Sequence, residues 1–160
     1  MDTADYHKKL HELVLNWKLR LIASALFSIL GLAVLISTTS GLLIEDFEIL
    51  DQTIVGVAVF VIVIPIYLII ADLPKIDEET IAKMLNETVP DLNSGAELVL
   101  KSTEELSEQE KEKRREVEVV FNDDKLYRFL PNYPMKQAVV LLLGCLLLTA
   151  GIYYYFQNYL

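Results

Sequence analysis

The chain has 160 residues, of which 53% are hydrophobic, and its formal net charge is −9. Together with a mean hydropathy of +0.37, this apolar content exceeds what a soluble domain of this size needs. The acidic balance argues against a nucleic-acid partner, because binding to phosphates requires a basic surface.

The apolar residues gather in three blocks that contain no charged side chain, at residues 21–44, 52–71 and 137–160. A helix rises about 1.5 Å per residue, so each block reaches roughly 30 Å, enough to cross the hydrocarbon core of a bilayer. A chain this short cannot bury three such helices in protein. We therefore predict an all-α integral membrane protein with a two-span hairpin, a small helical cytoplasmic insert and a third span.

The predicted segments follow from these blocks. They are an N-terminal amphipathic interfacial helix at 1–20, a transmembrane hairpin at 21–72, a cytoplasmic helical insert at 73–136 and a third transmembrane helix at 137–160. The first apolar block is too long, and its polar head too extended, for a cleavable signal peptide. We expect it to remain as an anchor.

The basic residues predict the orientation of the spans. All 14 lie either before the first block or between Lys75 and Lys136, and none lies in the 45–51 loop or at the C-terminal end. The positive-inside rule then places the N-terminus and the insert in the cytoplasm, with the 45–51 loop and the C-terminus facing outward.

Residues 4–20 have the pattern of an amphipathic helix. Tyr6, Leu10, Leu13 and Trp17 recur at helical spacing. We expect this helix to lie on the cytoplasmic leaflet or to continue straight into the first span. The residues expected at the two membrane interfaces are Trp17, Lys18 and Arg20 on the inner side and Tyr153, Tyr154 and Tyr155 on the outer side.

Small residues predict where the spans approach one another. Ser24, Ser28 and Gly31 share one face of the first span, and a face of small side chains lets a neighbouring helix come close. The candidate counterparts are Gly56 in the second span and Gly144 and Gly151 in the third. The spans contain no charged residue, which argues against a pump or carrier formed by this chain alone.

The insert has recognisable helix start and stop signals. Asp77 is a predicted N-cap for a helix that ends before Val89, because the residue preceding Pro90 avoids helical geometry. We expect Ser94 to cap a second helix that runs to about residue 106.

A capping box at 107–110 begins a third helix to about residue 116. The alternating residues 117–121 are compatible with a strand, but we prefer a helical continuation or an extended segment, followed by a turn at 123–124. The apolar residues expected to dock a partner are Ile81, Met84, Leu85, Pro90, Leu92 and Leu98.

No arrangement of residues in the sequence indicates an active site. His7 and His11 have a spacing that can hold zinc, but no further cysteine or histidine lies near enough to complete a site. Acidic residues of the insert such as Glu78 and Asp123 have no spacing that implies a catalytic role. We therefore expect no enzyme activity, metal or other cofactor.

Three stretches of the insert, IAK (81–83), VPDLN (89–93) and AELVL (96–100), together resemble a bacterial membrane family catalogued as domain of unknown function 4175. The resemblance covers nearly the whole chain and implies the same order of a polar helix, a hairpin, a cytoplasmic helical insert and a third span. Val89 stands where that family has an aromatic residue, and Ser94-Gly95 where a basic residue is usual. Typical members continue for hundreds of residues beyond the third span. The resemblance implies no catalytic residues.

These features lead to one preferred function and one alternative. The preferred function is a non-enzymatic membrane subunit that packs in a larger inner-membrane complex and offers a cytoplasmic docking surface. Its expected partners are the lipid bilayer, other membrane subunits or a second copy, and a cytoplasmic protein. The alternative is a subunit of an oligomeric channel or transporter, served by the hydroxyl-rich residues 37–40 and by Pro65.

Overall fold

The computed structural model describes residues 3–44, 46–92, 95–122 and 126–159. These residues form helices and connecting loops, with no strand among them. The chain divides into two compact units, one made of Met1–Leu19 with Leu73–Asn132 and the other of Arg20–Asp72 with Tyr133–Leu160. We call the first the polar unit and the second the three-helix unit, and we describe each by itself.

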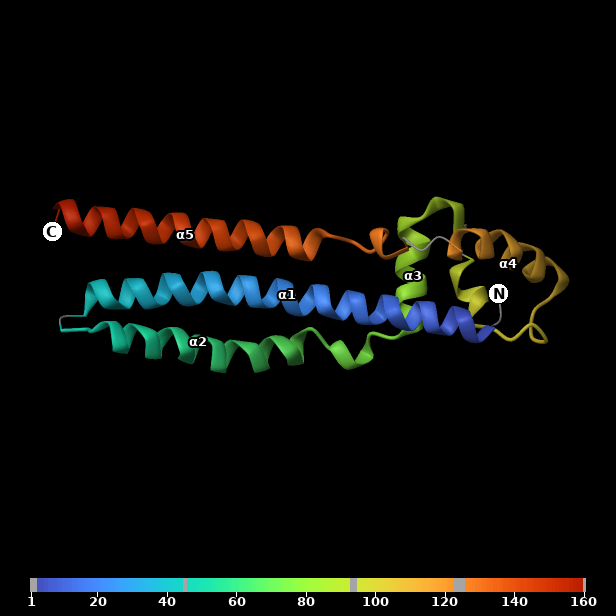
Figure 1. Cartoon of the computed structure of the whole chain (residues 1–160), viewed down its shortest axis with the longest axis horizontal. Helices are drawn as coiled ribbons and strands as arrows, with labels where there is room; N and C mark the ends of the chain where they lie inside the picture. Colours follow the sequence, from blue (N-terminus) through green and yellow to red (C-terminus); the bar gives the residue numbers. More distant parts are fainter. Residues whose placement is uncertain (1–2, 45, 93–94, 123–125, 160) are drawn as a thin grey trace. The chain divides into compact units, whose positions relative to one another are not determined.

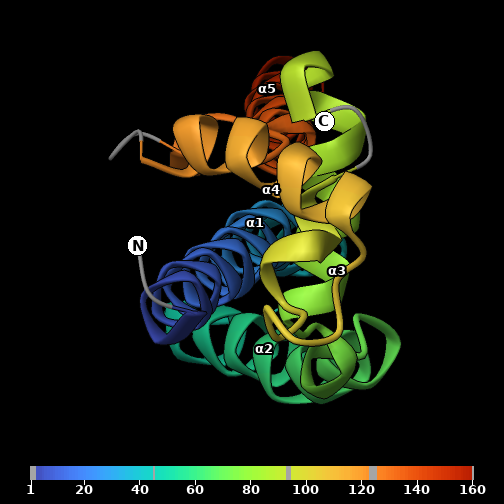
Figure 2. The same cartoon turned by 90° about the vertical axis from the view of Figure 1, so that its right-hand side faces the viewer.

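The three-helix unit contains the three predicted spans. They are α1 (Thr3–Leu43) from Arg20 onward, α2 (Ile49–Ile70) and α5 (Tyr133–Tyr159). Each is long and apolar enough to cross a membrane, which confirms the prediction of three candidate spans. Within the unit the helices run side by side with α1 between α2 and α5 (Figures 1 and 2).

Burial in this unit is concentrated on the central helix. Ala25, Ile29 and Ala33 of α1 are nearly inaccessible, whereas α2 has no buried residue. Hydroxyl groups within the helices bond to the carbonyl four residues earlier, as Thr39 does to Leu35. Such bonds let a hydroxyl lie in an apolar surrounding without an unsatisfied proton.

The polar unit is built from the first residues of α1 and six shorter helical segments. These are α3 (Glu78–Thr88), α4 (Glu108–Phe121) and the single turns of 3₁₀ helix at Leu73–Lys75, Pro90–Leu92, Ala96–Val99 and Leu126–Arg128, counted as described residues only. Its core contains Tyr6, Leu10, Leu13, Val14, Trp17, Ile81, Leu85, Leu92, Val99, Val117 and Phe121. The apolar face of the N-terminal segment is therefore covered by protein of its own unit.

Local sequence signals determine where α3 and α4 begin. The Asp77 side chain accepts a bond of 2.8 Å from the Thr80 N–H, and α3 ends at Thr88 as predicted. The capping box of α4 is also confirmed, because the Ser107 N–H donates to the Glu110 carboxylate at 2.9 Å. The same helix continues to Phe121, so residues 117–121 are helical rather than a strand.

The predicted second helix of the insert is wrong. Only Ala96–Val99 is helical, as a 3₁₀ turn, and the chain from Leu100 to Ser107 is turn and loop. The Lys101 carbonyl, which in a helix would accept a bond from a backbone N–H, instead accepts one from Arg114 Nη1 at 3.0 Å. The Ser94 cap and the turn at 123–124 lie outside the described residues.

Candidate functional site: the groove between α1 and α3

The residues predicted to dock a partner are mostly part of the polar unit's own core. Ile81, Leu85 and Leu92 are fully buried, and Leu98 is 9% exposed. Met84 is half-buried and Pro90 is exposed. A partner that binds the folded unit would therefore contact other residues, which lie on its surface.

A groove of about 490 Å³ lies between the start of α1 and the start of α3. One wall is basic and comes from α1, with His7, His11 and Lys18. The opposite wall is acidic and comes from Asp77, Glu78 and Glu79. Apolar side chains between the walls belong to Val14, Ile76 and Leu100.

The two walls of this groove are joined at one end by His7 and Glu78. The His7 Nδ1 lies 2.6 Å from the Glu78 carboxylate, and both side chains are partly exposed. Thr80 holds Asp77 in place, and the bond from its backbone N–H is the main reason that the pKa of Asp77 is lowered. Both carboxylates therefore lie at the positive N-terminal end of α3, where negative charge is stabilised.

His7 and His11 both line this groove. Among the residues that the structure describes, no group of three or more histidine, cysteine, aspartate or glutamate side chains is arranged to hold a metal ion. His7 instead pairs with Glu78, and His11 is exposed.

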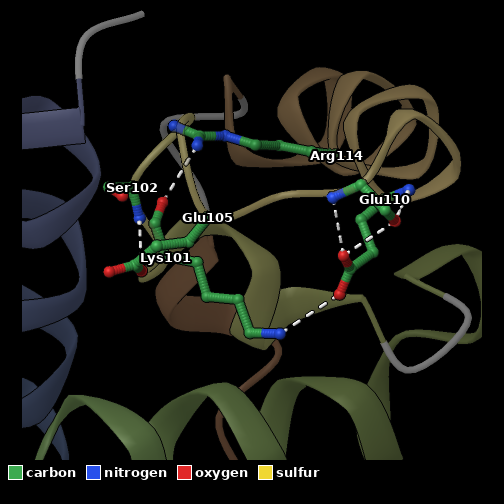
Figure 3. Close-up of polar contacts among 6 residues, drawn as sticks. Lys101, Ser102, Glu105, Glu110 and Arg114 are labelled. Atoms are coloured by element: carbon green, nitrogen blue, oxygen red, sulfur yellow. Dashed lines mark hydrogen bonds and ion pairs between the residues drawn. The ribbon is translucent and has the colours of Figure 1, made fainter.

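A buried arginine fixes the loop that follows the 3₁₀ turn. Arg114 is 6% exposed and its Nη1 donates to the Lys101 carbonyl at 3.0 Å (Figure 3). Lys101 in turn donates to the Glu110 carboxylate at 3.1 Å. The Arg114 guanidinium also lies 3.3 Å from Glu118 and 5.7 Å from the centre of the Tyr6 ring. No pattern in the sequence singles out Arg114 for this role.

The tyrosine beneath this arginine is also perturbed. Tyr6 meets Phe121 edge to face, with ring centroids 6.0 Å apart. Its hydroxyl is buried and lacks a hydrogen bond of ordinary geometry, although the carboxylate of Glu118 is near. Burial, followed by the Glu118 charge, raises the pKa of Tyr6 to about 12 against the opposing effect of Arg114. This cluster ties α1 to α4 within the polar unit.

The predicted interface residues have two different surroundings. Trp17 is 3% exposed and lies in the core of the polar unit, whereas Lys18 lines the groove and Arg20 is half-buried. At the end of α5, Tyr153, Tyr154 and Tyr155 are all exposed. The contact of these side chains with a membrane interface stays a prediction.

Some of the predicted packing residues lie in close contacts between helices, and others do not. Ser24 is buried, and a Cβ added to Gly31 would lie 3.0 Å from Leu142 Cα of α5. A Cβ added to Gly56 of α2 would lie 3.8 Å from the Ser37 Cβ of α1. A Cβ added to Gly144 or Gly151 would have no neighbour within 4 Å, so these two glycines make no close contact in this unit. The half-buried Ser28 lies beside a cavity instead.

The residues invoked for a channel are partly used in packing. The Ser37 hydroxyl donates to the Gln52 carbonyl at 2.6 Å and so joins α1 to α2. Pro65 is exposed on α2. Among the residues that the structure describes, no contact favours a channel over a packed subunit.

Comparison with known proteins adds no relative. No family model, no curated protein and no solved structure matches the chain. The resemblance to domain of unknown function 4175 therefore stays an expectation from the sequence.

Proposed function

We propose that the chain is a non-enzymatic integral membrane subunit of a bacterial inner-membrane complex, and that its polar unit binds a cytoplasmic protein partner in the groove between α1 and α3. The observation that carries the membrane assignment is the surface of the three-helix unit. Large apolar side chains are widely exposed there, as in Val61, Ile69 and Leu147 at 67%, 78% and 74%. Contiguous apolar surface of this kind is stable only against lipid or another protein.

The distribution of charge supports the orientation. Basic residues are confined to the N-terminal segment and the region between α2 and α5, so the polar unit faces the cytoplasm. The same unit has a folded core of its own, which lets it present a fixed surface to a partner.

The side chains that line the groove favour a partner segment of mixed charge. Its basic and acidic walls face an apolar floor, and a segment that carries both signs around an apolar side chain would complement all three. Side chains at such a site contribute specificity through charge pairing and affinity through the buried apolar contact.

Native mass spectrometry after mild detergent extraction of membranes tests this proposal. We expect the chain in a complex with at least one other protein, and a chain found alone would contradict the proposal. Lys18→Glu reverses a charge in the groove and should release the cytoplasmic partner. Lys8→Glu makes the same change at an exposed position of α1 outside the groove and should leave the complex intact. Equal loss from both variants would argue against the groove as the binding surface.

A further inference from the structure

The helices α1 and α5 are in close contact at one height along their axes and are separated at another. At Gly31 the two helices are in contact, because an added Cβ would lie 3.0 Å from Leu142 Cα and 3.3 Å from Cys145 Cβ. Toward the start of the span the three helices enclose a cavity of about 390 Å³, open on one side. The cavity is lined by Ser24, Ala25, Ser28, Ile29, Leu32, Val63, Tyr67, Pro134, Gln137, Ala138 and Leu141.

The cavity is polar at one end and apolar at the other. The Ser24 hydroxyl donates to the Arg20 carbonyl at 2.6 Å, and the Tyr67 hydroxyl donates to the Leu21 carbonyl at 3.1 Å. Both hydroxyl protons are thereby used, and the amide of Gln137 supplies the hydrogen-bond donors at the same end. At the other end the lining residues Leu32, Val63 and Leu141 are purely apolar.

We propose that this cavity binds one acyl chain of a membrane lipid, with the chain along the apolar end and the ester end near Tyr67 and Gln137. The inference rests on the proposed function, since it requires the three-helix unit to lie in a bilayer. The volume falls within the range of about 300–1,000 Å³ that is typical of small-molecule sites. Water is a poor occupant, because the apolar end offers it no hydrogen-bonding partners.

A lipid chain fits this cavity better than a helix of a second copy. A helix with its side chains is about 10 Å or more in diameter and needs a groove along several turns. The α1 residues that line the cavity extend only from Ser24 to Leu32, and the α1–α5 contact at Gly31 lies at the far end of this stretch, so the space is short. An acyl chain is thin and flexible, and its ester oxygens accept hydrogen bonds from an amide such as that of Gln137.

Photocrosslinking in lipid nanodiscs tests this site. The purified full chain is reconstituted with phosphatidylcholine that contains a small fraction of phosphatidylcholine bearing a diazirine in one acyl chain, and crosslinked residues are mapped by mass spectrometry. We expect crosslinks to concentrate on cavity residues such as Leu32 and Leu141. Crosslinks spread evenly over the exposed faces of α2 and α5 would mean ordinary surrounding lipid and would overturn the proposal.

Two variants fill the cavity from different helices. Ser28→Phe and Leu141→Phe should each abolish the concentrated crosslinks at Leu32, while Leu147→Phe, on an exposed face of α5, should leave them unchanged. If Ser28→Phe fails to fold, the comparison between the two α5 variants decides the matter. Undiminished crosslinking at Leu32 in folded Leu141→Phe would refute the site.

The result is separable from that of the proposed function. A chain that enters nanodiscs and crosslinks in the cavity, yet has no protein partner in native mass spectrometry, keeps the lipid site and loses the subunit proposal. A chain found in a complex, but with evenly spread crosslinks, would support the subunit proposal and refute the lipid site.

Discussion

Replacing Arg114 with methionine should destabilise the polar unit by about 3 kcal/mol. The substitution keeps an unbranched, flexible side chain but removes the donors that reach the Lys101 carbonyl and Glu118. A hydrogen bond that involves a charged group contributes about 1.5–3 kcal/mol, and a cation over an aromatic ring about 0.5–2 kcal/mol. Glu118 is 29% exposed, so its ion pair is partly screened and adds little to this sum.

The single tryptophan of the chain gives the assay. Trp17 is 3% exposed in the core of the same unit, so its fluorescence during urea titration in mild detergent follows the unfolding of the polar unit. Arg115→Met is the matched control, because Arg115 is the next residue of α4 and is exposed. That change should alter the free energy of unfolding by no more than about 0.5 kcal/mol. Equal unfolding free energies for the two variants would refute the role assigned to Arg114.

Three further predictions follow from the same structure. In SDS titrations, the Gly31→Ala variant should be less stable than the Gly144→Ala variant by about 1–3 kcal/mol. Both variants gain helix propensity, but only the Cβ added at Gly31 meets a backbone atom at 3.0 Å. Equal unfolding midpoints would contradict this packing. The pKa of Tyr6 is raised from 10.0 to about 12, so the unfolded state ionises first and stability should fall as pH rises between these values; urea midpoints of Tyr6→Phe should lack this fall. Hydrogen bonds from the Ser107 N–H and hydroxyl, and then from Lys101, lower the pKa of Glu110 from 4.5 to about 2. The contribution of the Glu110 carboxylate to stability should therefore be lost as pH falls through this window. An equally steep loss of stability in acid for the Glu110→Gln variant would disprove this prediction.

The features that sequence reasoning predicted correctly are local ones. A span is indicated by its own uninterrupted apolar run, and a cap by residues three positions apart, as in Asp77 with Thr80. The end of α3 before Pro90 likewise follows from steric contact between neighbours. None of these signals depends on what the segment packs against.

The features that it missed depend on contacts between distant residues. The apolar face of α1 was visible in the sequence, but its cover includes Phe121, whose carbonyl accepts a bond from Lys9 across 112 positions. Docking and core residues share the same apolar spacing, so Ile81 and Leu85 could not be told apart from surface contacts before their burial was known. In the loop after Val99 the Lys101 carbonyl accepts a bond from Arg114 across 13 positions, and this contact has no sequence signature.

The continuity of α1 has a consequence for the order in which the chain folds during synthesis. The first residues of α1 belong to the polar unit, but the rest of that unit begins only at Leu73. The hairpin bond from Ser37 to Gln52 spans 15 positions and can form once α2 has been made, whereas the bond from Lys9 to Phe121 must wait for most of the chain. Until α4 leaves the ribosome, Tyr6 lacks the cover that Phe121 gives it, and the membrane surface or a chaperone would have to shield the exposed ring.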